Sequence, residues 1–313
     1  MSAADLSVGA IIVTHNSATH LGPCLDAAVR YCGSVVVVDN GSRDDTCAIA
    51  ANRAGVHLIR NPDNLGFAAA TNIGYRFLDR EMILLLNPDA VIRSPLQRLS
   101  ELCRQANVAV ASGKLMGANG QVQAGFAVRR FPSPLSMCFE VLGLNRVWPR
   151  NPVNRRYRCA DVDLDRAQMV EQPAGAFLMV RRDAWTQLGG LDERFHPLWF
   201  EDVDFLLRLR RAGYEVWYEP SVEAIHTGGH SLDYLSHKEI VWYWYGNLLQ
   251  YAAKHFGPVS VRLVAASVIA GSLIRSVLKR ISTDPGIDSG YTTVIRFAGR
   301  IFRTGGRVGS GRP

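Results

Sequence analysis

Short, uninterrupted apolar runs alternate with stretches of helical periodicity over the first third of the chain. Apolar runs without polar alternation are typical of strands covered on both faces, as in a parallel sheet built from strand–helix–strand units. The pattern therefore predicts an α/β fold with a mainly parallel central sheet flanked by helices. We expect strands over residues 8–13, 35–38, 56–59 and 82–86, and helices over residues 18–31 and 67–78, with another that begins at Asp44 or Asp45 and ends at residue 54.

The second half of the chain is less regular. Residues 145–168 are rich in Arg, Pro and Asn and lack apolar periodicity, so we expect them to form a long loop. Regular patterns return beyond that segment. We expect strands over residues 174–180 and 215–218, and helices over residues 183–188, 202–211 and 234–256.

An apolar run near the C-terminus raises the question of a membrane. Residues 263–274 are uncharged and are flanked by Arg262 and Arg275. A helix needs about 20 apolar residues to span a bilayer, so this run is predicted not to cross one. An apolar helix with arginines at its ends and a basic tail favours a position in an anionic membrane surface. The alternative is a helix that packs on the body of the protein, followed by a disordered tail.

Charge is distributed unevenly along the 313 residues. The net charge is +7, and the segment from residue 261 onward has nine basic residues against two acids, which equals the whole excess. Residues 129–158 have seven arginines against one acid, so the rest of the chain is mildly acidic. An acidic body with two basic surfaces, without a recognised nucleic-acid-binding motif, argues against nucleic acid as the partner.

Composition and cysteine usage fit a globular protein of the cytosol. Hydrophobic residues make up 48% of the chain, which is enough for a sizeable core. The six cysteines form no CxxC pair or other metal-binding spacing, so we expect buried, reduced thiols. The N-terminus lacks a basic region followed by an apolar stretch, so no signal peptide is expected.

Acidic side chains follow two of the predicted strands and begin one of the predicted helices. Asp39 and Asp89 come after apolar runs, and Glu201, Asp202 and Asp204 lie together further along the chain. Ligands of open α/β sheets bind beyond the carboxyl ends of the strands. One acid there can hold a divalent cation against a diphosphate, and a second can deprotonate an attacking hydroxyl. This arrangement indicates sugar transfer from a nucleotide.

Six short motifs occur in a fixed order: Ile-Ile-Val-Thr-His-Asn at 11–16, Val-Val-Asp-Asn-Gly-Ser at 37–42, Asn-Leu-Gly-Phe at 64–67, Asn-Pro-Asp at 87–89, Gly-Gly-Leu-Asp-Glu at 189–193 and Glu-Asp-Val-Asp at 201–204. The ordered set resembles glycosyltransferase family 2, whose fold is called GT-A, over residues 7–232. It is especially similar to bacterial rhamnosyltransferases that extend polyprenyl-diphosphate-linked sugars, as in mycobacterial cell-wall linker synthesis.

The resemblance implies a GT-A domain over residues 6–232, with a nucleotide-binding half at 6–106 and an acceptor half at 107–232. Residues 233–313 would then form a helical, basic C-terminal region that is apposed to the membrane.

The resemblance also places nucleotide binding at Asp39, whose carboxylate can accept hydrogen bonds from a nucleobase imide or a ribose hydroxyl. Thr14 would lie beside it and contact the base. Asn64 and Asn72 bound a loop of small residues that lets the backbone approach a diphosphate. Taken alone, Asp39 is better explained as part of a turn, and the loop as an ordinary helix start.

Asp89 is the expected ligand of a Mg²⁺ or Mn²⁺ ion that neutralises the charge growing on a departing nucleoside diphosphate. The family usually shows Asp-x-Asp here, whereas this chain has Asn87 in place of the first acid. The ion would then depend on diphosphate, water and another ligand. The resemblance makes His226 that ligand, with His230 as a weaker candidate, although a lone histidine is more often structural.

Asp202 is the expected general base, because an inverting transfer needs a carboxylate within about 3 Å of the attacking hydroxyl oxygen. Glu201 is expected to bind the acceptor or support the base, and Trp199 to form an apolar wall near the acceptor sugar. Structural explanations compete with these roles. Acids favour the first turn of a helix, Asp204 with Arg208 has the spacing of an ordinary i,i+4 ion pair, and an aromatic core would account for Trp199.

The sequence thus predicts an inverting, metal-dependent glycosyltransferase of cell-envelope glycan synthesis that moves rhamnose or a similar sugar from a dTDP- or UDP-linked donor. The acceptor would be a polyprenyl-linked or polysaccharide hydroxyl. The protein would be cytoplasmic and peripheral at the inner face of the plasma membrane. The arginines of residues 146–158 would receive the diphosphate of a lipid-linked acceptor, or they would form a solvated basic loop.

Two alternatives stay open. A non-catalytic nucleotide-sugar-binding or scaffold protein of a cell-wall assembly is favoured by the substitution at Asn87. A sugar nucleotidyltransferase is disfavoured, because residues 14–17 do not form the glycine- and basic-rich loop that such enzymes usually carry after the first strand.

Overall fold

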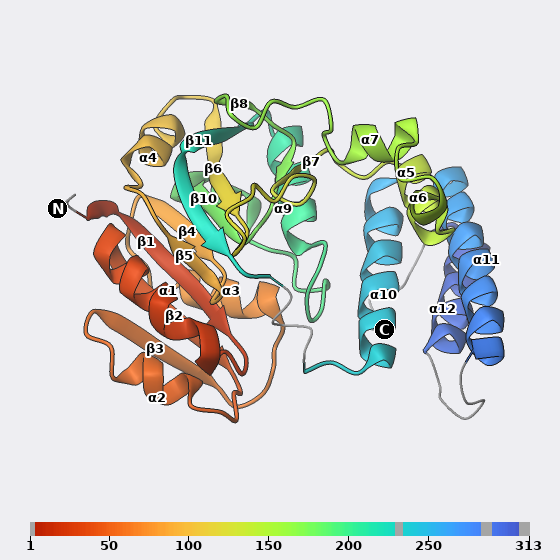
Figure 1. The fold of residues 1–313 in the computed structure, drawn as a ribbon, viewed down its shortest axis with the longest axis horizontal. Coiled ribbons are helices and arrows are strands. Elements are labelled where there is room, and N and C mark those ends of the chain that lie inside the picture. The colour runs from red at the N-terminus through yellow and green to blue at the C-terminus, as the bar shows by residue number, and fades with distance from the viewer. Residues whose placement is uncertain (1–3, 229–233, 283–289, 307–313) are drawn as a thin grey trace.

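The computed structural model describes residues 4–228, 234–282 and 290–306. A nine-stranded sheet occupies one side of the molecule and a group of long helices the other (Figure 1). The strands of this sheet are β1 (Asp5–Thr14), β2 (Cys32–Asn40), β3 (Val56–Asn61), β4 (Met82–Leu86), β5 (Ala90–Ile92), β6 (Val108–Met116), β8 (Gln168–Met169), β10 (Phe177–Arg181) and β11 (Glu215–His226). A separate two-stranded sheet pairs β7 (Val128–Arg129) with β9 (Gln172–Pro173).

The helices lie between and beyond these strands. They are α1 (Ala18–Tyr31), α2 (Thr46–Ala51), α3 (Phe67–Tyr75), α4 (Gln97–Cys103), α5 (Pro134–Val141), α6 (Leu144–Val147), α7 (Pro152–Tyr157), α8 (Arg182–Leu188), α9 (Glu201–Arg211), α10 (His237–His255), α11 (Pro258–Ser282) and α12 (Tyr291–Thr304). The strand and helix order of the first half matches the prediction from the apolar pattern.

The large sheet has the order β3-β2-β1-β4-β10-β6-β11-β5, with β8 paired to β11. The first four strands run parallel, as do β6 and β11, while β10 is inserted antiparallel between β4 and β6. The predicted, mostly parallel sheet is thereby confirmed. Because β1 pairs with β2 on one side and with β4 on the other, the carboxyl ends of these strands open a crevice where ligands of such sheets bind.

Both faces of the central strands are covered, which explains their uninterrupted apolar runs. Ile12 of β1 packs in a core with Leu25 of α1. The neighbouring Ile11 points to the opposite face and joins a second core with Phe205 of α9. All six cysteines are buried free thiols, which confirms the prediction for their state.

Two parts of the chain differ from the prediction. Residues 145–168 were expected to be one long loop, but they contain most of α6 and all of α7. Asn151 caps α7 by accepting a hydrogen bond from the backbone of Asn154, and a proline begins the helix, so capping replaces the missing apolar periodicity. The strand expected over residues 215–218 continues to His226, because it stays paired with β6 across two register shifts and its last three residues also pair with β5.

A third core joins the C-terminal helices to the rest of the protein. Residues of α10, α11 and α12 pack there with Val141 of α5 and Val203 of α9. Arg275 of α11 also donates a hydrogen bond to the carbonyl oxygen of Val141. The C-terminal helices therefore form one side of the same molecule as the sheet, and α5 belongs to their core although it precedes them in sequence (Figure 1).

Helix α11 is longer and more apolar than the run expected over residues 263–274. A 21-residue stretch, residues 258–278, is long and apolar enough to cross a membrane by length and composition, and 39% of its most apolar window is buried against the protein. Val264 and Val268 lie in the third core, while Leu273 and Val277 are half exposed or more. The helix thus has one face on the protein and one apolar face outward.

Candidate functional site

The carboxyl ends of β1 and β2 place Thr14 beside Asp39. The two residues are partners in the strand register, and the Thr14 hydroxyl donates to Oδ1 of Asp39 over 2.9 Å. The backbone N–H and the hydroxyl of Ser42 donate to the same carboxylate, at 2.9 and 2.5 Å. Both Thr14 and Asp39 are buried. The prediction that they stand together at a strand end is confirmed, and the carboxylate is held in place to accept further hydrogen bonds.

The two asparagines of the glycine-containing loop hold backbone in place. Oδ1 of Asn64 accepts from the N–H of Gly66, which has a positive φ of 85° and lies too close to His196 for a Cβ atom. The Asn72 amide donates to the Leu191 carbonyl oxygen, and its oxygen accepts from the Leu191 N–H. Asn72 therefore ties α3 to the Gly-Gly-Leu-Asp-Glu motif, and neither asparagine lines the main cavity. Their contact with a nucleotide stays a prediction.

Asp89 and His226 meet at the other end of the crevice. His226 is the last residue of β11 and pairs with Ala90 of β5, directly after Asp89. Its Nε2 lies 3.5 Å from Oδ1 of Asp89, and both side chains are buried. Oδ2 of Asp89 accepts from the backbone N–H of Gly228 over 2.9 Å. Burial lowers the pKa of His226, while the Asp89 charge acts in the opposite direction.

Gln123 fixes which nitrogen of His226 is free. The Gln123 amide N–H donates to the His226 carbonyl oxygen over 2.8 Å, so its Oε1 faces Nδ1 of the ring at 3.0 Å. An oxygen there requires a proton on Nδ1, and the neutral imidazole then carries its lone pair on Nε2, toward Asp89. This is the outer-shell arrangement usual for a metal-binding histidine.

The donor set fits a hard cation only in part. In residues 4–228, 234–282 and 290–306, no group of three or more His, Cys, Asp or Glu side chains converges as a metal cluster. Asp89 and His226 supply one oxygen and one nitrogen, and Asn87 lines the same cavity. Mg²⁺ and Mn²⁺ are commonly held by few protein ligands together with substrate phosphates. His230 lies outside the described residues.

Asp202 sits in the first turn of α9 and opens onto the cavity. Its Oδ2 accepts from the N–H of Gly175 over 3.1 Å, and its Oδ1 accepts from the N–H of Val203 over 2.8 Å. The chain enters this helix through Trp199 and Phe200, both at positive φ. Burial raises the pKa of Asp202, although the backbone N–H groups and the charge of Arg129 oppose that rise. The group is a fixed carboxylate with enhanced basicity.

Glu201 and Asp204 occupy very different surroundings on the same helix. Glu201 is buried, lines the cavity, and its Oε2 has no hydrogen-bond partner among the described residues. Burial, with the nearby Asp202 charge, raises the pKa of Glu201 well above its usual value. Asp204 faces away and forms ion pairs with Arg208 at 2.8 Å and Lys254 at 2.5 Å. The i,i+4 explanation for Asp204 is confirmed.

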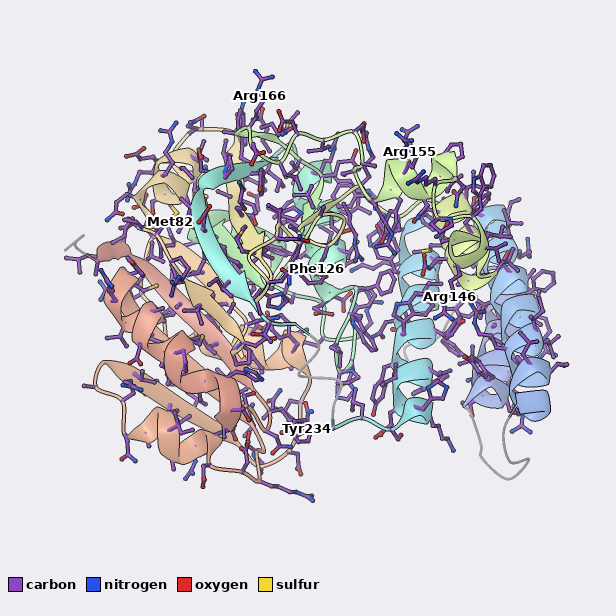
Figure 2. All side chains as sticks on the ribbon, viewed as in Figure 1. Met82, Phe126, Arg146, Arg155, Arg166 and Tyr234 are labelled. Carbon is purple, nitrogen blue, oxygen red and sulfur yellow. The ribbon has the colours of Figure 1, made fainter. Side chains whose placement is uncertain are left out.

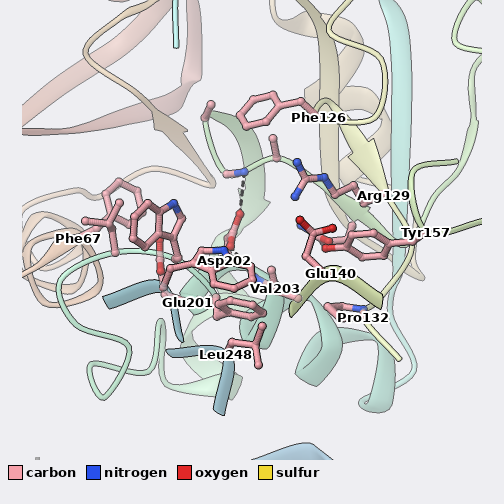
Figure 3. A pocket seen from close by; sticks show the side chains of 18 of the residues that line it. Phe67, Phe126, Arg129, Pro132, Glu140, Tyr157, Glu201, Asp202, Val203 and Leu248 are labelled. Atoms are coloured by element: carbon pink, nitrogen blue, oxygen red, sulfur yellow. Dashed lines mark hydrogen bonds between the residues drawn. The ribbon is translucent and has the colours of Figure 1, made fainter. Parts of the chain in front are cut away.

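One cavity of about 490 Å³ joins three of the acids that the sequence analysis singled out, Asp89, Glu201 and Asp202. Its lining includes Asp89, from the turn before β5, and His226, from the end of β11, together with Trp199, Glu201 and Asp202 at the start of α9. Figure 3 shows Asp202 beside Glu201 and across from Phe126, and Figure 2 places Phe126 near the middle of the molecule. Thr14 and Asp39 do not line this space. The cavity therefore brings together the predicted cation ligands and the predicted base.

Sequence reasoning missed several residues of this cavity. Gln123 faces the His226 ring, Phe126 stacks on that ring at 5.3 Å, and Arg129 and Glu140 line the cavity together with Phe126. They lie on short elements without strong periodicity. The one available signal was the arginine-rich composition that begins at Arg129.

Comparison with known proteins gives a consistent result. Residues 10–160 match the sequence model described as glycosyl transferase family 2. An N-acetylglucosaminyl-diphospho-decaprenol L-rhamnosyltransferase of Mycobacterium tuberculosis is 32% identical over 244 residues, which cover 71% of this chain and 76% of that protein.

Two solved structures share the architecture. S. aureus TarS 1-349 in complex with UDP-GlcNAc superposes with a TM-score of 0.55 at 14% identity, covering 96% of this chain and 81% of that chain. Mannosyltransferase PcManGT from Pyrobaculum calidifontis, in complex with GDP-Man and Mn²⁺, gives a TM-score of 0.50 at 16% identity, covering 96% and 85%. These likenesses confirm the predicted GT-A fold.

Proposed function

The chain belongs to glycosyl transferase family 2 and is therefore a glycosyltransferase, and on this premise we propose that it is an inverting, metal-dependent enzyme of cell-envelope glycan synthesis. It moves rhamnose or a similar sugar from a dTDP- or UDP-linked donor to a hydroxyl of a polyprenyl-linked or polysaccharide acceptor. The similar mycobacterial protein is named for rhamnosyl transfer to a diphospho-decaprenol sugar, which supports this choice of substrates.

The observation that carries the proposal is the shared cavity of Asp89, His226 and Asp202. An in-line displacement needs the leaving group and the attacking oxygen on opposite sides of one anomeric carbon. Two candidate cation ligands and a separate carboxylate from α9, within one cavity, can serve those two ends of the reaction. The buried Asp39 accepts hydrogen bonds from the hydroxyl groups of Thr14 and Ser42. Together with Thr14, it supports a contact with the nucleobase or the ribose further along the crevice.

In the proposed reaction, the acceptor hydroxyl approaches the anomeric carbon from the side of Asp202. The carboxylate takes the hydroxyl proton as the new carbon–oxygen bond forms. The bond from that carbon to the donor diphosphate oxygen breaks, and the diphosphate leaves toward Asp89 and His226. A divalent cation bound there supplies Lewis-acid stabilisation of the charge on the leaving group. Burial and the neighbouring Asp202 charge raise the pKa of Glu201 well above its usual value, so its neutral form is favoured beside the charged base.

We place the enzyme at the inner face of the plasma membrane, where a polyprenyl-linked acceptor is held. The outward apolar face of α11, together with the exposed Val147 and Trp148 next to it, supports a peripheral position on the bilayer. The arginines of the C-terminal region favour an anionic surface.

A screen of nucleotide sugars tests the proposal. Purified protein with Mn²⁺ is supplied with dTDP-rhamnose, UDP-GlcNAc or other donors and with a short-chain prenyl diphosphoryl N-acetylglucosamine. Release of nucleoside diphosphate is measured together with the mass and anomeric configuration of the product. We expect acceptor-dependent turnover with dTDP-rhamnose and an inverted product. Turnover of no nucleotide sugar, or retention of configuration, overturns the proposal.

A further inference from the structure

The wall of the cavity formed by β7 and α7 carries a guanidinium group that the proposed reaction does not use. Arg129 ends β7, and its Nε donates to the carbonyl oxygen of Gly125 over 2.7 Å. Its guanidinium carbon lies 5.8 Å from the ring centroids of Phe126 and Tyr157. Two aromatic rings and one backbone carbonyl therefore fix its orientation. No described residue forms a hydrogen bond or ion pair with its terminal nitrogens.

A second arginine lines the same wall in a similar way. Arg158 follows α7, and its Nε donates to Oδ1 of Asn154 over 3.0 Å. Its aliphatic part packs against Gly125, on the turn that also anchors Arg129. In each arginine, Nε donates to a protein oxygen, and the two terminal nitrogens remain for a ligand. That edge of a guanidinium matches two phosphate oxygens.

The ring of Phe126 contacts both Arg129 and His226, and the charge of Arg129 also acts on Asp202. Figure 3 shows its guanidinium pointing into the space that the Asp202 and Glu140 carboxylates share. Thr14 and Asp39, at the proposed nucleotide end, do not line this cavity. A phosphate at Arg129 would therefore lie near the attacking oxygen rather than near the nucleoside.

We propose that Arg129, assisted by Arg158, binds the phosphate groups that link the acceptor sugar to its lipid. The inference rests on the proposed function and deepens it by naming the site for the charged part of the acceptor. In a prenyl diphosphoryl sugar, the diphosphate and the reacting hydroxyl are attached to the same ring. A carboxylate for the hydroxyl and guanidinium groups for the phosphates, within one cavity, match that arrangement.

The rest of this wall agrees with a lipid-linked acceptor. Beyond the arginines the cavity is lined by Met137 of α5 and by Trp244 and Leu248 of α10, which are apolar. These helices belong to the core that also supports α11 and its outward apolar face. The first prenyl units would leave the cavity along this side.

Glu140 lines the cavity together with Arg129, and its carboxylate faces the same space (Figure 3). Its Oε2 accepts a hydrogen bond from the Asn145 amide over 2.6 Å, which holds the carboxylate back. A negative charge next to a diphosphate opposes its binding. Glu140→Gln is therefore expected to lower KM for a diphosphate acceptor, whereas a simple structural role for the glutamate predicts no such gain.

The experiment compares three acceptors that carry the same N-acetylglucosamine: a farnesyl diphosphoryl sugar, a farnesyl monophosphoryl sugar and an uncharged octyl glycoside. The kcat/KM of each is measured for wild type, Arg129→Gln, Arg129→Lys and Arg130→Gln. Arg130 is the matched control, because it faces a different pocket and pairs with Asp161 at 2.6 Å. We expect Arg129→Gln to reduce kcat/KM for the diphosphate acceptor about 30-fold or more, with Arg129→Lys intermediate.

The uncharged acceptor separates phosphate binding from folding. The loss of kcat/KM caused by Arg129→Gln is expected to be at least about tenfold smaller for this acceptor than for the diphosphate acceptor, since only a charged acceptor loses a contact with the guanidinium. Equal losses for all three acceptors, or no loss for the diphosphate acceptor, overturn the inference while leaving the transferase intact. Failure of the wild type to turn over any acceptor instead contradicts the proposed function.

The donor also carries a diphosphate, so its contribution is measured separately. Binding of UDP and dTDP with Mn²⁺ is titrated by calorimetry for wild type and Arg129→Gln. Unchanged nucleotide affinity is the result expected for an acceptor site. A loss of nucleotide affinity as large as the loss in kcat/KM assigns Arg129 to the donor and overturns the inference.

Discussion

The Nε2 atom of His226 lies 3.5 Å from the carboxylate oxygen Oδ1 of Asp89, although the two residues are far apart in sequence. β11 brings them together because its end pairs in antiparallel register with β5, which begins at the residue after Asp89. The backbone N–H of Thr227 also donates to the Asp89 carbonyl oxygen. The sheet itself, rather than a flexible loop, thus sets the spacing of the two proposed cation ligands.

Gln123→Ala is expected to weaken the binding of Mn²⁺ about 10- to 100-fold, because His226 would lose the hydrogen bond that keeps its lone pair toward Asp89. The measurement is calorimetric titration of UDP at a series of Mn²⁺ concentrations, together with the Mn²⁺ dependence of turnover. Gln121→Ala is the control, since that side chain is exposed. An unchanged Mn²⁺ requirement in Gln123→Ala would contradict the assigned role.

Asp202→Asn is expected to reduce turnover by about 10²- to 10⁴-fold, because the amide cannot accept the acceptor proton. Binding of the nucleotide should persist, since the carboxylate is not at the nucleotide end of the crevice. Turnover is measured as kcat, and nucleotide binding as the calorimetric Kd of UDP with Mn²⁺. Near-normal turnover of Asp202→Asn removes this residue from the role of base.

The pH profile of the wild type offers an independent check on Asp202. Burial raises its pKa above the ordinary aspartate value of 3.8, so turnover should fall on the acid side at a higher pH than for an exposed carboxylate. The charge of Arg129 opposes the rise, so Arg129→Gln should move this acid limb to still higher pH. An acid limb that stays in place in Arg129→Gln would count against the proximity of the two groups.

Glu201→Gln is expected to stabilise the protein at neutral pH. Burial raises the pKa of Glu201 well above 4.5, so the fold favours the protonated form. That contribution is fully present below the unfolded-state pKa and is lost as the pH rises through the folded-state pKa. Glutamine has no proton to lose, so the Tm advantage of Glu201→Gln should grow with pH. The exposed Glu101→Gln serves as control, and a constant Tm difference would be the contrary result.

The apolar pattern was sufficient for the central sheet but not for the site. The strands β1 to β4 are each covered on both faces, so each can be recognised in the sequence from its own apolar run. The pairing of His226 with Ala90 depends on register shifts within β11, which no local pattern encodes. The position of Arg129 depends on a two-residue strand and on partners from α7, so its sequence neighbourhood showed only that it is basic.

Lys254→Met is expected to destabilise the protein by about 2–3 kcal/mol, because it leaves the buried Asp204 with fewer partners. Although burial raises the pKa of Asp204, hydrogen bonds from His255 and Lys254 outweigh it and hold the pKa below its usual value. That stability is present above the unfolded-state pKa and is lost as the pH falls through the folded-state pKa.

Urea unfolding at neutral pH and acid unfolding measure the effect of Lys254→Met. The acid transition should move to higher pH in the variant. Arg53→Ala is the control, since its ion pair with Asp26 is exposed on both sides and is expected to contribute less than about 1 kcal/mol. Equal losses of unfolding free energy in Lys254→Met and Arg53→Ala would mean that the Asp204–Lys254 ion pair between α9 and α10 contributes no more than a surface ion pair.

The outward face of α11 is expected to bind anionic vesicles. Leu273 and Val277 are 50% and 56% exposed, and replacing both by Gln should weaken partitioning about 100-fold if each buries its side chain in the bilayer. Phe77→Gln, an equally exposed apolar residue on the sheet side, should leave partitioning unchanged. Co-sedimentation with vesicles of increasing phosphatidylglycerol content gives the measurement.

Because Val264 and Val268 pack in the protein core, α11 cannot present apolar residues on all sides to lipid. Carbonate at alkaline pH should therefore release the wild type from membranes, whereas a spanning helix would resist extraction.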